Sequence, residues 1–348
     1  MVNINFWKNK KVLITGHTGF KGGWLSFFLK NTNCKLYGIS LKPEVRSFFN
    51  QTNLKSYFFK SKFINITNFK SLDKNIKNFC PEIIFHMAAQ PIVLDSYRNP
   101  LETFQTNIIG TANLINICKN LKSIKVIIII TTDKCYENSD KSLKFFKETD
   151  KLGGKDPYSA SKACCEILSN SMYNSFLKEK GIRLATVRAG NVVGGGDYSD
   201  FRIVPDIYNS IDKNKVVKVR NPHAIRPWQH VMEPVYGYIK LAEKIFKDDK
   251  LNGAWNFGPE KKNIKTVQDL VETLNDIKQF KYNMNNKKKT DKEASFLALD
   301  ISKIKKSRIW KPQLNFKETL KLTSDWYGAK NKVEITNKQI KKYLNEFL

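Results

Sequence analysis

Hydrophobic residues in the first half of the chain follow two alternating patterns. Short apolar runs occur at residues 11–15, 83–87 and 126–130, and the last reads Val-Ile-Ile-Ile-Ile, as expected of a strand buried on both faces. Between these runs, apolar residues recur at intervals of three and four, which is typical of helices that pack one face on a core. The two patterns together predict further strands at residues 35–40 and 184–188, and helices at residues 20–30, 101–120 and 159–178.

This alternation predicts the fold class. Strands separated by helices form a parallel sheet, and right-handed crossovers place the helices on both of its faces. We therefore predict an α/β fold with a doubly wound parallel sheet of the Rossmann type in residues 1–188. After Gly190 the run Gly194-Gly195-Gly196 and several prolines interrupt the periodicity. A smaller, mixed C-terminal substrate-binding domain is therefore predicted in residues 189–348, and the part near residues 226–257 is expected to return to the first domain.

Composition narrows the classes of partner. The 60 Lys and Arg residues exceed the 32 Asp and Glu residues and give a formal charge of +28, but they are scattered, with one dense run at Lys287-Lys288-Lys289. They do not alternate with aromatic residues as on a surface that stacks nucleic-acid bases. We therefore expect compositional bias, with no nucleic-acid or membrane partner. The positive field should still attract a substrate that carries a diphosphate.

The chain shows no sign of a membrane span, a signal peptide or a metal site. Its longest apolar run, residues 126–130, is far shorter than a span, and the N-terminal segment lacks an apolar stretch. The six cysteines form no C-x-x-C pair, and the four histidines lack the spacing of metal ligands. A cytoplasmic protein with reduced thiols and no metal is expected.

A glycine pattern follows the first predicted strand. Gly16, Gly19 and Gly22 form G-x-x-G-x-x-G between that strand and a helix. Gly16 permits a tight turn, Gly19 lets the backbone approach a pyrophosphate, and Gly22 allows close packing of helix on sheet. The helix N-terminus adds amide donors and a positive dipole end. The pattern predicts a dinucleotide-binding site.

The second predicted strand does not identify the dinucleotide. The residue that reads the adenosine ribose is expected about 20 residues after the glycines, where an acid favours NAD. The segment there is Gly38-Ile39-Ser40-Leu41-Lys42, without an acid. Because Lys42 could pair with a 2′-phosphate, these residues leave NAD and NADP both open.

Candidate catalytic residues follow further along the chain. Thr131-Thr132-Asp133-Lys134 comes straight after the strand of isoleucines, and Tyr158 and Lys162 form Y-x-x-x-K. On a helix, positions i and i+4 share a face, so the lysine ammonium should favour the phenolate and lower the tyrosine pKa. Such a tyrosine can take the proton of a sugar hydroxyl while a hydride leaves for nicotinamide.

These motifs together resemble the extended short-chain dehydrogenase/reductase family. Within it they are similar to the nucleotide-sugar 4,6-dehydratases that act on CDP-glucose, and the resemblance runs from Phe6 to about Tyr327. TDKCYEN and HAIRPWQH are its specific pieces. The other segments that carry it are FWKNKKVLITGHTGFKGGWLS, HMAAQPIV, KLGGKDPYSASK, VRAGNVVGGGD and AWNFGP.

The resemblance implies a three-stage reaction with NAD as cofactor. Tyr158, assisted by Thr132 and Lys162, removes the proton of the glucose 4-hydroxyl while C4 is oxidised. Water then leaves across C5–C6, with Asp133 as acid and Lys134 as base, and hydride returns to C6. Relatives that use dTDP-glucose carry a glutamate in place of Lys134, and a lysine base needs a depressed pKa.

The resemblance also implies binding residues and an assembly. A homodimer through a four-helix bundle of residues 101–120 and 159–178 is expected, a tetramer is also allowed, and the product would supply deoxysugars for a surface polysaccharide. Asn65 stands where relatives carry an aspartate, and Asn107 is equally well explained as a polar residue satisfied within a helix. The implied substrate contacts are His86, Gln90, Asn191, Arg202, Arg226 and Asn256, and the implied cofactor contacts are Gly16, Thr18, Gly19, Phe20, Gly22, Ser40, Asn65, Ile66, Ala88, Ala89, Gln90, Asn107, Tyr158 and Lys162.

Two other functions remain open on the sequence. A nucleotide-sugar epimerase needs the same hydride removal but no elimination, so the Thr-Asp-Lys triplet argues against it. A non-catalytic protein that binds dinucleotides or nucleotide sugars would keep the glycines but could lose Tyr158 or Lys162, and both are present. The choice of CDP over other nucleotides rests on the resemblance alone.

Overall fold

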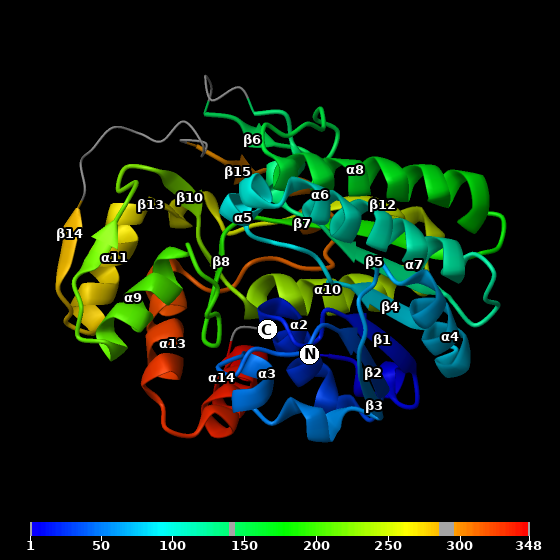
Figure 1. Cartoon of the computed structure of the whole chain (residues 1–348), viewed down its shortest axis with the longest axis horizontal. Helices are drawn as coiled ribbons and strands as arrows, with labels where there is room; N and C mark the ends of the chain where they lie inside the picture. Colours follow the sequence, from blue (N-terminus) through cyan, green and yellow to red (C-terminus); the bar gives the residue numbers. More distant parts are fainter. Residues whose placement is uncertain (1, 139–142, 285–295, 347–348) are drawn as a thin grey trace.

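The computed structural model describes residues 2–138, 143–284 and 296–346, so the lysine run at Lys287–Lys289 lies outside the described residues (Figure 1). Within them, seven parallel strands form the central sheet in the order β12-β7-β5-β4-β1-β2-β3. The strands are β1 (Lys11–Thr15), β2 (Lys35–Ser40), β3 (Lys60–Phe63), β4 (Ile83–His86), β5 (Val126–Ile130), β7 (Arg183–Ala189) and β12 (Gly253–Phe257).

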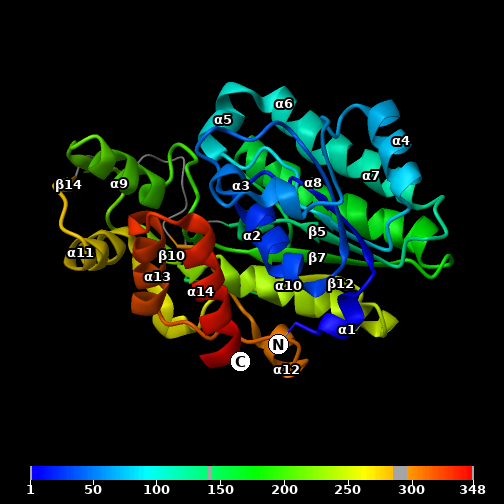
Figure 2. The same ribbon diagram turned by 90° about the horizontal axis from the view of Figure 1, so that it is seen from below.

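Helices cover both faces of this sheet (Figure 2). Strand β5 shows why two layers are needed, because successive side chains point to opposite faces. Ile127 and Ile129 pack in one core, and Val126, Ile128 and Ile130 pack in the other. The first layer holds α4 (Phe69–Phe79), α6 (Pro100–Phe104), α7 (Gly110–Cys118) and α8 (Pro157–Met172), and the second holds α2 (Phe20–Leu29) and α10 (Met232–Ile245). The predicted doubly wound α/β fold is confirmed.

The order of the strands indicates at which edge of the sheet a ligand would bind. Strand β1 lies between β2 and β4, so the chain leaves β1 toward one side and reaches β4 on the other. In open parallel sheets, ligands bind at such a switch point, outside the carboxyl ends of the strands. The segments that follow β1, β4 and β5 carry the glycine pattern, the HMAAQ segment and the Thr-Asp-Lys triplet. The topology therefore brings the predicted motifs to one edge.

The second half of the chain divides between the sheet and a separate lobe. Strand β12 pairs in parallel with β7, and α10 packs against α2 and β5. The lobe, at the left of Figure 1, has its own core, which includes Ile207, Leu270 and Leu320. Its elements are α9 (Ile203–Asp212), β9 (Val217–Val219), β10 (Ile225–Pro227), β13 (Ile264–Thr266), α11 (Val267–Ile277), β14 (Tyr282–Met284) and α13 (Phe316–Gly328).

Shorter elements and the C-terminal helix complete the structure. Helix α14 (Lys332–Glu346) packs Tyr343 against the rings of Phe28 and Tyr236 in the second layer. None of the described helices is long and apolar enough to cross a membrane. The short elements are α1 (Ile4–Trp7), α3 (Phe48–Gln51), α5 (Val93–Arg98), β6 (Phe145–Phe146), β8 (Val192–Val193), β11 (Gln229–His230), β15 (Ala298–Leu299) and α12 (Ser302–Lys306).

Candidate active site

The glycine turn after β1 leaves no room for side chains. Gly16 has a φ of 74°, and a Cβ there would lie 2.6 Å from the backbone nitrogen of Ala88. A Cβ at Gly22 would lie 2.1 Å from the carbonyl oxygen of Gly16. The turn therefore holds α2 close to the sheet, and the first amides of α2 face the strand ends, where they fit a pyrophosphate.

A cavity of about 360 Å³ opens over this turn. Tyr158, Lys162 and Arg202 reach its walls from α8 and from the segment before α9. Most of the predicted cofactor contacts also line it, namely Gly16, Thr18, Gly19, Phe20, Gly22, Ser40, Asn65, Ile66, Ala88 and Ala89. One concavity thus joins the glycine turn to the Y-x-x-x-K pair.

The adenosine end of the cavity carries hydroxyls and amides. Ser40 Oγ lies 2.7 Å from Thr18 Oγ1, and Thr18 also donates to the carbonyl oxygen of Leu41. Lys42 is exposed, and Asn65 accepts a bond from the backbone of Thr67. Since no carboxylate lies among the cavity residues at the end of β2, this geometry is compatible with either dinucleotide.

The chain turns sharply after β5. Thr132 is extended and caps a 3₁₀ turn, Asp133–Cys135, by accepting a bond from the backbone of Lys134. The Thr132 hydroxyl also lies 3.0 Å from Asp133 Oδ1. Asp133 is buried, and in the described part of the chain its Oδ2 has no hydrogen-bond partner. Adjacent residues on a strand point to opposite sides, and the turn removes that constraint for Asp133 and Lys134. Thr132, Asp133 and Lys134 are not among the residues that line the cavity, so their contacts with a ligand stay predictions.

Helix α8 presents Tyr158 and Lys162 toward this turn. Asp156 caps the helix through the backbone of Ser159, and Lys162 Nζ donates to the carbonyl oxygen of Ile130 at 3.0 Å. Burial raises the pKa of Tyr158 to about 12, opposed by hydrogen bonding to Thr132 and by the charge of Arg202. The expected net lowering of the tyrosine pKa by Lys162 is therefore wrong.

The predicted substrate contacts differ in their positions. Arg202 lines the cavity and is held by an ion pair of 2.8 Å with Asp197. Arg226 is buried in β10, where Nη1 donates to the carbonyl oxygen of Ile225, and the carbonyl of Asn191 accepts a bond from Gln229. Neither Arg226 nor Asn191 is among the residues that line the cavity, so their contacts with substrate stay predictions.

Two of the predicted substrate contacts, His86 and Asn256, already have hydrogen-bond partners inside the protein. The ring nitrogens of His86 lie 2.7 Å from Thr15 Oγ1 and 3.0 Å from Thr111 Oγ1, and burial lowers the pKa of His86 to about 3. Asn256 is fully buried, and its amide donates to the carbonyls of Phe146 and Asp300. Both side chains are buried and bonded to partners inside the protein, so their contacts with substrate stay predictions.

Gln90 and Asn107 are bonded to each other and to neighbouring segments. Gln90 donates its side-chain amide to Thr103 and accepts from the backbone of Ile92. Asn107 is buried, accepts from the backbone of Gln90, and donates to Ser161 Oγ at 2.8 Å. These side chains connect the loop after β4 to α8, and neither residue is among those that line the cavity, so their contacts with a ligand stay predictions. For Asn107, the alternative of a satisfied polar residue is the one that holds.

Lys21 is a cavity residue that the sequence reasoning missed. It lies in the first turn of α2 between Phe20 and Gly22 and lines the cavity. Burial lowers its pKa to about 8, and the nearby charges of Arg202 and Lys162 act in the same direction. A charged residue inside the glycine pattern was the available signal, because that pattern is expected to lie against the cavity.

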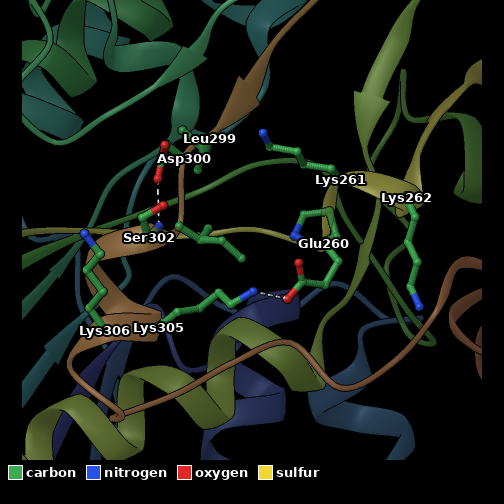
Figure 3. Close-up of a pocket in the computed structure, with 10 residues that line it drawn as sticks. Glu260, Lys261, Lys262, Leu299, Asp300, Ser302, Lys305 and Lys306 are labelled. Atoms are coloured by element: carbon green, nitrogen blue, oxygen red, sulfur yellow. Dashed lines mark hydrogen bonds and ion pairs between the residues drawn. The ribbon is translucent and has the colours of Figure 1, made fainter.

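A second, larger concavity of about 800 Å³ lies between the segment after β12 and α12 (Figure 3). Its lysines are exposed, and one of them, Lys305, pairs with Glu260 at 2.6 Å. None of the predicted site residues lines this concavity. Tyr158, Lys162 and the predicted cofactor contacts that line a cavity all lie at the one over the glycine turn.

Known proteins are similar to this chain over most of their length. The chain is 41% identical over 340 residues to a CDP-glucose 4,6-dehydratase of Salmonella typhimurium, which covers 94% of this chain and 93% of that protein. It is 28% identical over 335 residues to a UDP-glucuronate 4-epimerase of Thermodesulfobacterium geofontis, which covers 93% of this chain and 97% of that protein.

Solved structures show the same fold. A UDP-glucuronic acid 4-epimerase from Bacillus cereus, in complex with UDP-glucuronic acid and NAD, superposes with a TM-score of 0.79 at 22% identity and covers 91% of this chain and 98% of its own. A dTDP-glucose 4,6-dehydratase from Bacillus anthracis, in complex with NAD, gives 0.74 at 21% identity, over 91% and 96% of the two chains.

The family assignment rests on a match that includes the whole cavity. The sequence model of the GDP-mannose 4,6 dehydratase family matches residues 13–323, from β1 into α13. That span contains the glycine turn, the turn after β5 and the Y-x-x-x-K pair. The chain belongs to the GDP-mannose 4,6 dehydratase family.

Proposed function

We propose that this protein dehydrates CDP-glucose to CDP-4-keto-6-deoxyglucose with NAD as its cofactor. The observation that carries the proposal is the turn at Asp133 and Lys134, placed at the carboxyl end of β5 beside the pair Tyr158 and Lys162. Besides the dinucleotide oxidant, an oxidation at C4 needs one base, the tyrosine, but an elimination also needs an acid and a base of its own. The 41% identity to the Salmonella CDP-glucose 4,6-dehydratase supports CDP as the nucleotide.

The first stage is oxidation at C4. NAD⁺ supplies a reversible two-electron oxidant, and the narrow turn at Gly16 and Gly22 fits its pyrophosphate. Tyr158 takes the proton of the 4-hydroxyl, while Thr132 hydrogen-bonds to the phenol oxygen and stabilises its charged form. Lys162, fixed by the carbonyl of Ile130, holds its ammonium at the same end of the cavity.

The second stage is elimination across C5–C6. The new 4-ketone acidifies the C5–H, and Lys134 removes that proton while Asp133 protonates the departing 6-hydroxyl. The buried Asp133 Oδ2, which has no partner within the described residues, is the oxygen available for that contact. Reversal of the redox step at C6 and protonation of C5 complete the cycle, and the cofactor ends in its starting state.

An assay with four substrates tests the proposal. Initial rates with CDP-, dTDP-, UDP- and GDP-glucose should favour CDP-glucose by about 10-fold or more in kcat/KM, since a site that hydrogen-bonds one base leaves polar groups unpaired with another. The product should absorb in alkali as a 4-keto-6-deoxy sugar does. An epimerised sugar without that absorbance would identify an epimerase, and no product at all would identify a binding protein.

The identity of the cofactor is a separate prediction. A cofactor that is regenerated in every cycle need not dissociate, so the purified protein should release NAD when it is denatured. Lys42 lies at the end of β2, where it could meet a 2′-phosphate, and it is the residue that argues for NADP. Chromatography of the released dinucleotide decides, and recovery of mostly NADP would contradict the prediction.

We also propose that two copies associate through α6, α7 and α8. These three helices pack against one another, and large apolar side chains are exposed on them or on the helical turns that adjoin them. Leu101 in α6 is 75% exposed and Ile167 in α8 is 59% exposed, while Ile109, just before α7, is 50% exposed and Phe176, just after α8, is 42% exposed. Apolar residues gathered on adjacent helices mark an interface, and a twofold axis would pair them into four helices.

Lysine at two of these positions should separate the copies. Ile109→Lys with Ile167→Lys would bury two charges per subunit in the proposed interface, so light scattering should give the mass of a monomer. Val45 is 87% exposed and lies in the segment after β2, so Val45→Lys is the matched control and should keep the wild-type mass. A double variant that stays dimeric would place the interface elsewhere.

A further inference from the structure

Helix α8 carries a third functional position on the face that holds Tyr158 and Lys162. Glu166 lies four residues after Lys162, and only 3% of its side chain is exposed. Its carboxylate accepts from Thr131 Oγ1 at 2.5 Å, from Thr186 Oγ1 at 2.6 Å and from Arg188 Nη2 at 2.7 Å. One carboxylate therefore joins α8 to the ends of both β5 and β7.

The partner Arg188 extends this contact. Its Nη1 donates to the hydroxyl of Tyr136 at 2.7 Å and to the carbonyl of Glu148 at 3.2 Å. The guanidinium also lies 4.8 Å from the centre of the Tyr136 ring, and 4% of the Arg188 side chain is exposed. Arg188 thus fixes Tyr136, the residue that follows the turn Asp133–Cys135.

The two contacts fix both ends of the turn Asp133–Cys135 that carries the proposed elimination residues. Thr131 immediately precedes Thr132 and Asp133, and Tyr136 immediately follows the turn Asp133–Cys135. Glu166 accepts a hydrogen bond from Thr131, and Arg188 donates one to Tyr136. The ion pair between Glu166 and Arg188 connects these two contacts. The backbone between them carries both groups that the elimination needs.

A buried ion pair is a poor way to stabilise a fold, because desolvation of the two charges offsets their attraction. Such a pair can instead fix the position of reacting groups, and a shift of those groups by about 1 Å can reduce turnover by about 100-fold. We infer that Glu166 and Arg188 form a positioning pair that sets the orientation of the Thr132–Lys134 turn for the elimination step. The inference rests on the proposed function.

Arg188→Lys tests the geometry apart from the charge. A lysine keeps the positive charge beside Glu166 but cannot bridge Glu166 and Tyr136 with a planar fork. With CDP-glucose, kcat should fall by about 10- to 100-fold while KM stays within about 2-fold, because binding does not depend on the turn. Tyr136→Phe removes only the hydroxyl at the far end and should act in the same direction.

The step that slows distinguishes positioning from general damage. The turn carries both groups assigned to the elimination but only one, Thr132, that assists the oxidation, so a displaced turn should slow the elimination more than the oxidation. A larger fraction of the bound nicotinamide should then be reduced at steady state than in the wild type. Glu233 is an equally buried carboxylate that accepts from Tyr343 and Leu314 in the second helix layer. Glu233→Gln is the matched control, and it should leave kcat per folded molecule and the reduced fraction unchanged.

The outcomes separate this inference from the proposed function. If the wild type does not dehydrate CDP-glucose, the proposed function fails. If the wild type is active and both variants turn over at the wild-type rate, the positioning pair is wrong. A fall in kcat that matches the loss of folded protein, with no rise in reduced nicotinamide, also overturns it. Should Arg188→Lys not fold, Tyr136→Phe carries the same test alone.

Discussion

Replacing Tyr158 by phenylalanine is expected to lower kcat by about 100-fold or more, the usual loss when a general base is removed. The phenol oxygen is the atom that takes the 4-hydroxyl proton, and phenylalanine keeps the ring packed in the wall of the cavity. Because oxidation is the first stage, absorbance of reduced nicotinamide should also be lost when CDP-glucose is added in a single turnover. Both quantities are measured by stopped-flow absorbance and product analysis.

The control for this variant is a tyrosine outside the cavity. Tyr57 is 40% exposed in the segment before β3, so Tyr57→Phe should keep wild-type turnover. A Tyr158→Phe protein that reduces nicotinamide at the wild-type rate would remove Tyr158 from the oxidation. Thr132→Val should slow the same step, because it deletes a hydrogen bond that opposes the effect of burial on the pKa of Tyr158.

The fold was predictable where burial leaves a simple pattern in the sequence. Strand β5 is covered on both faces, so each of its residues is apolar and the run is recognised at once. Strand β3 lies at the edge of the sheet and reads Lys60-Ser61-Lys62-Phe63, with mostly exposed side chains, so it carries no such signal. Strand β3 pairs with one strand only, β2, and this pairing is what makes the segment a strand.

The site was predictable at the level of segments and less so at the level of atoms. A motif predicts which segment comes to the strand ends, as with the glycine turn and Lys162. It does not say which side chains are already bound from within, because those partners come from distant segments: His86 is held by Thr15 and Thr111. Glu166 was missed for the same reason, since its meaning comes from Arg188 on another element.

Asp133→Asn and Lys134→Met are expected to lower product formation by about 100-fold each while leaving the first oxidation intact. Oxidation at C4 uses Tyr158 and NAD⁺ but neither of these side chains. Each variant should therefore accumulate reduced nicotinamide on the protein after CDP-glucose is added. Lys306→Met and Asp73→Asn, both remote from the cavity over the glycine turn, are the matched controls and should form product normally.

Exchange with solvent deuterium separates the acid from the base. In Asp133→Asn the base Lys134 remains, so the C5 proton of the oxidised sugar should exchange even though water does not leave, and the recovered CDP-glucose should carry deuterium at C5. In Lys134→Met neither elimination nor exchange should occur. Exchange in Lys134→Met but not in Asp133→Asn would reverse the two roles. Normal product formation by both variants, or no reduction of nicotinamide by either, would show that the turn after β5 does not divide the elimination in this way.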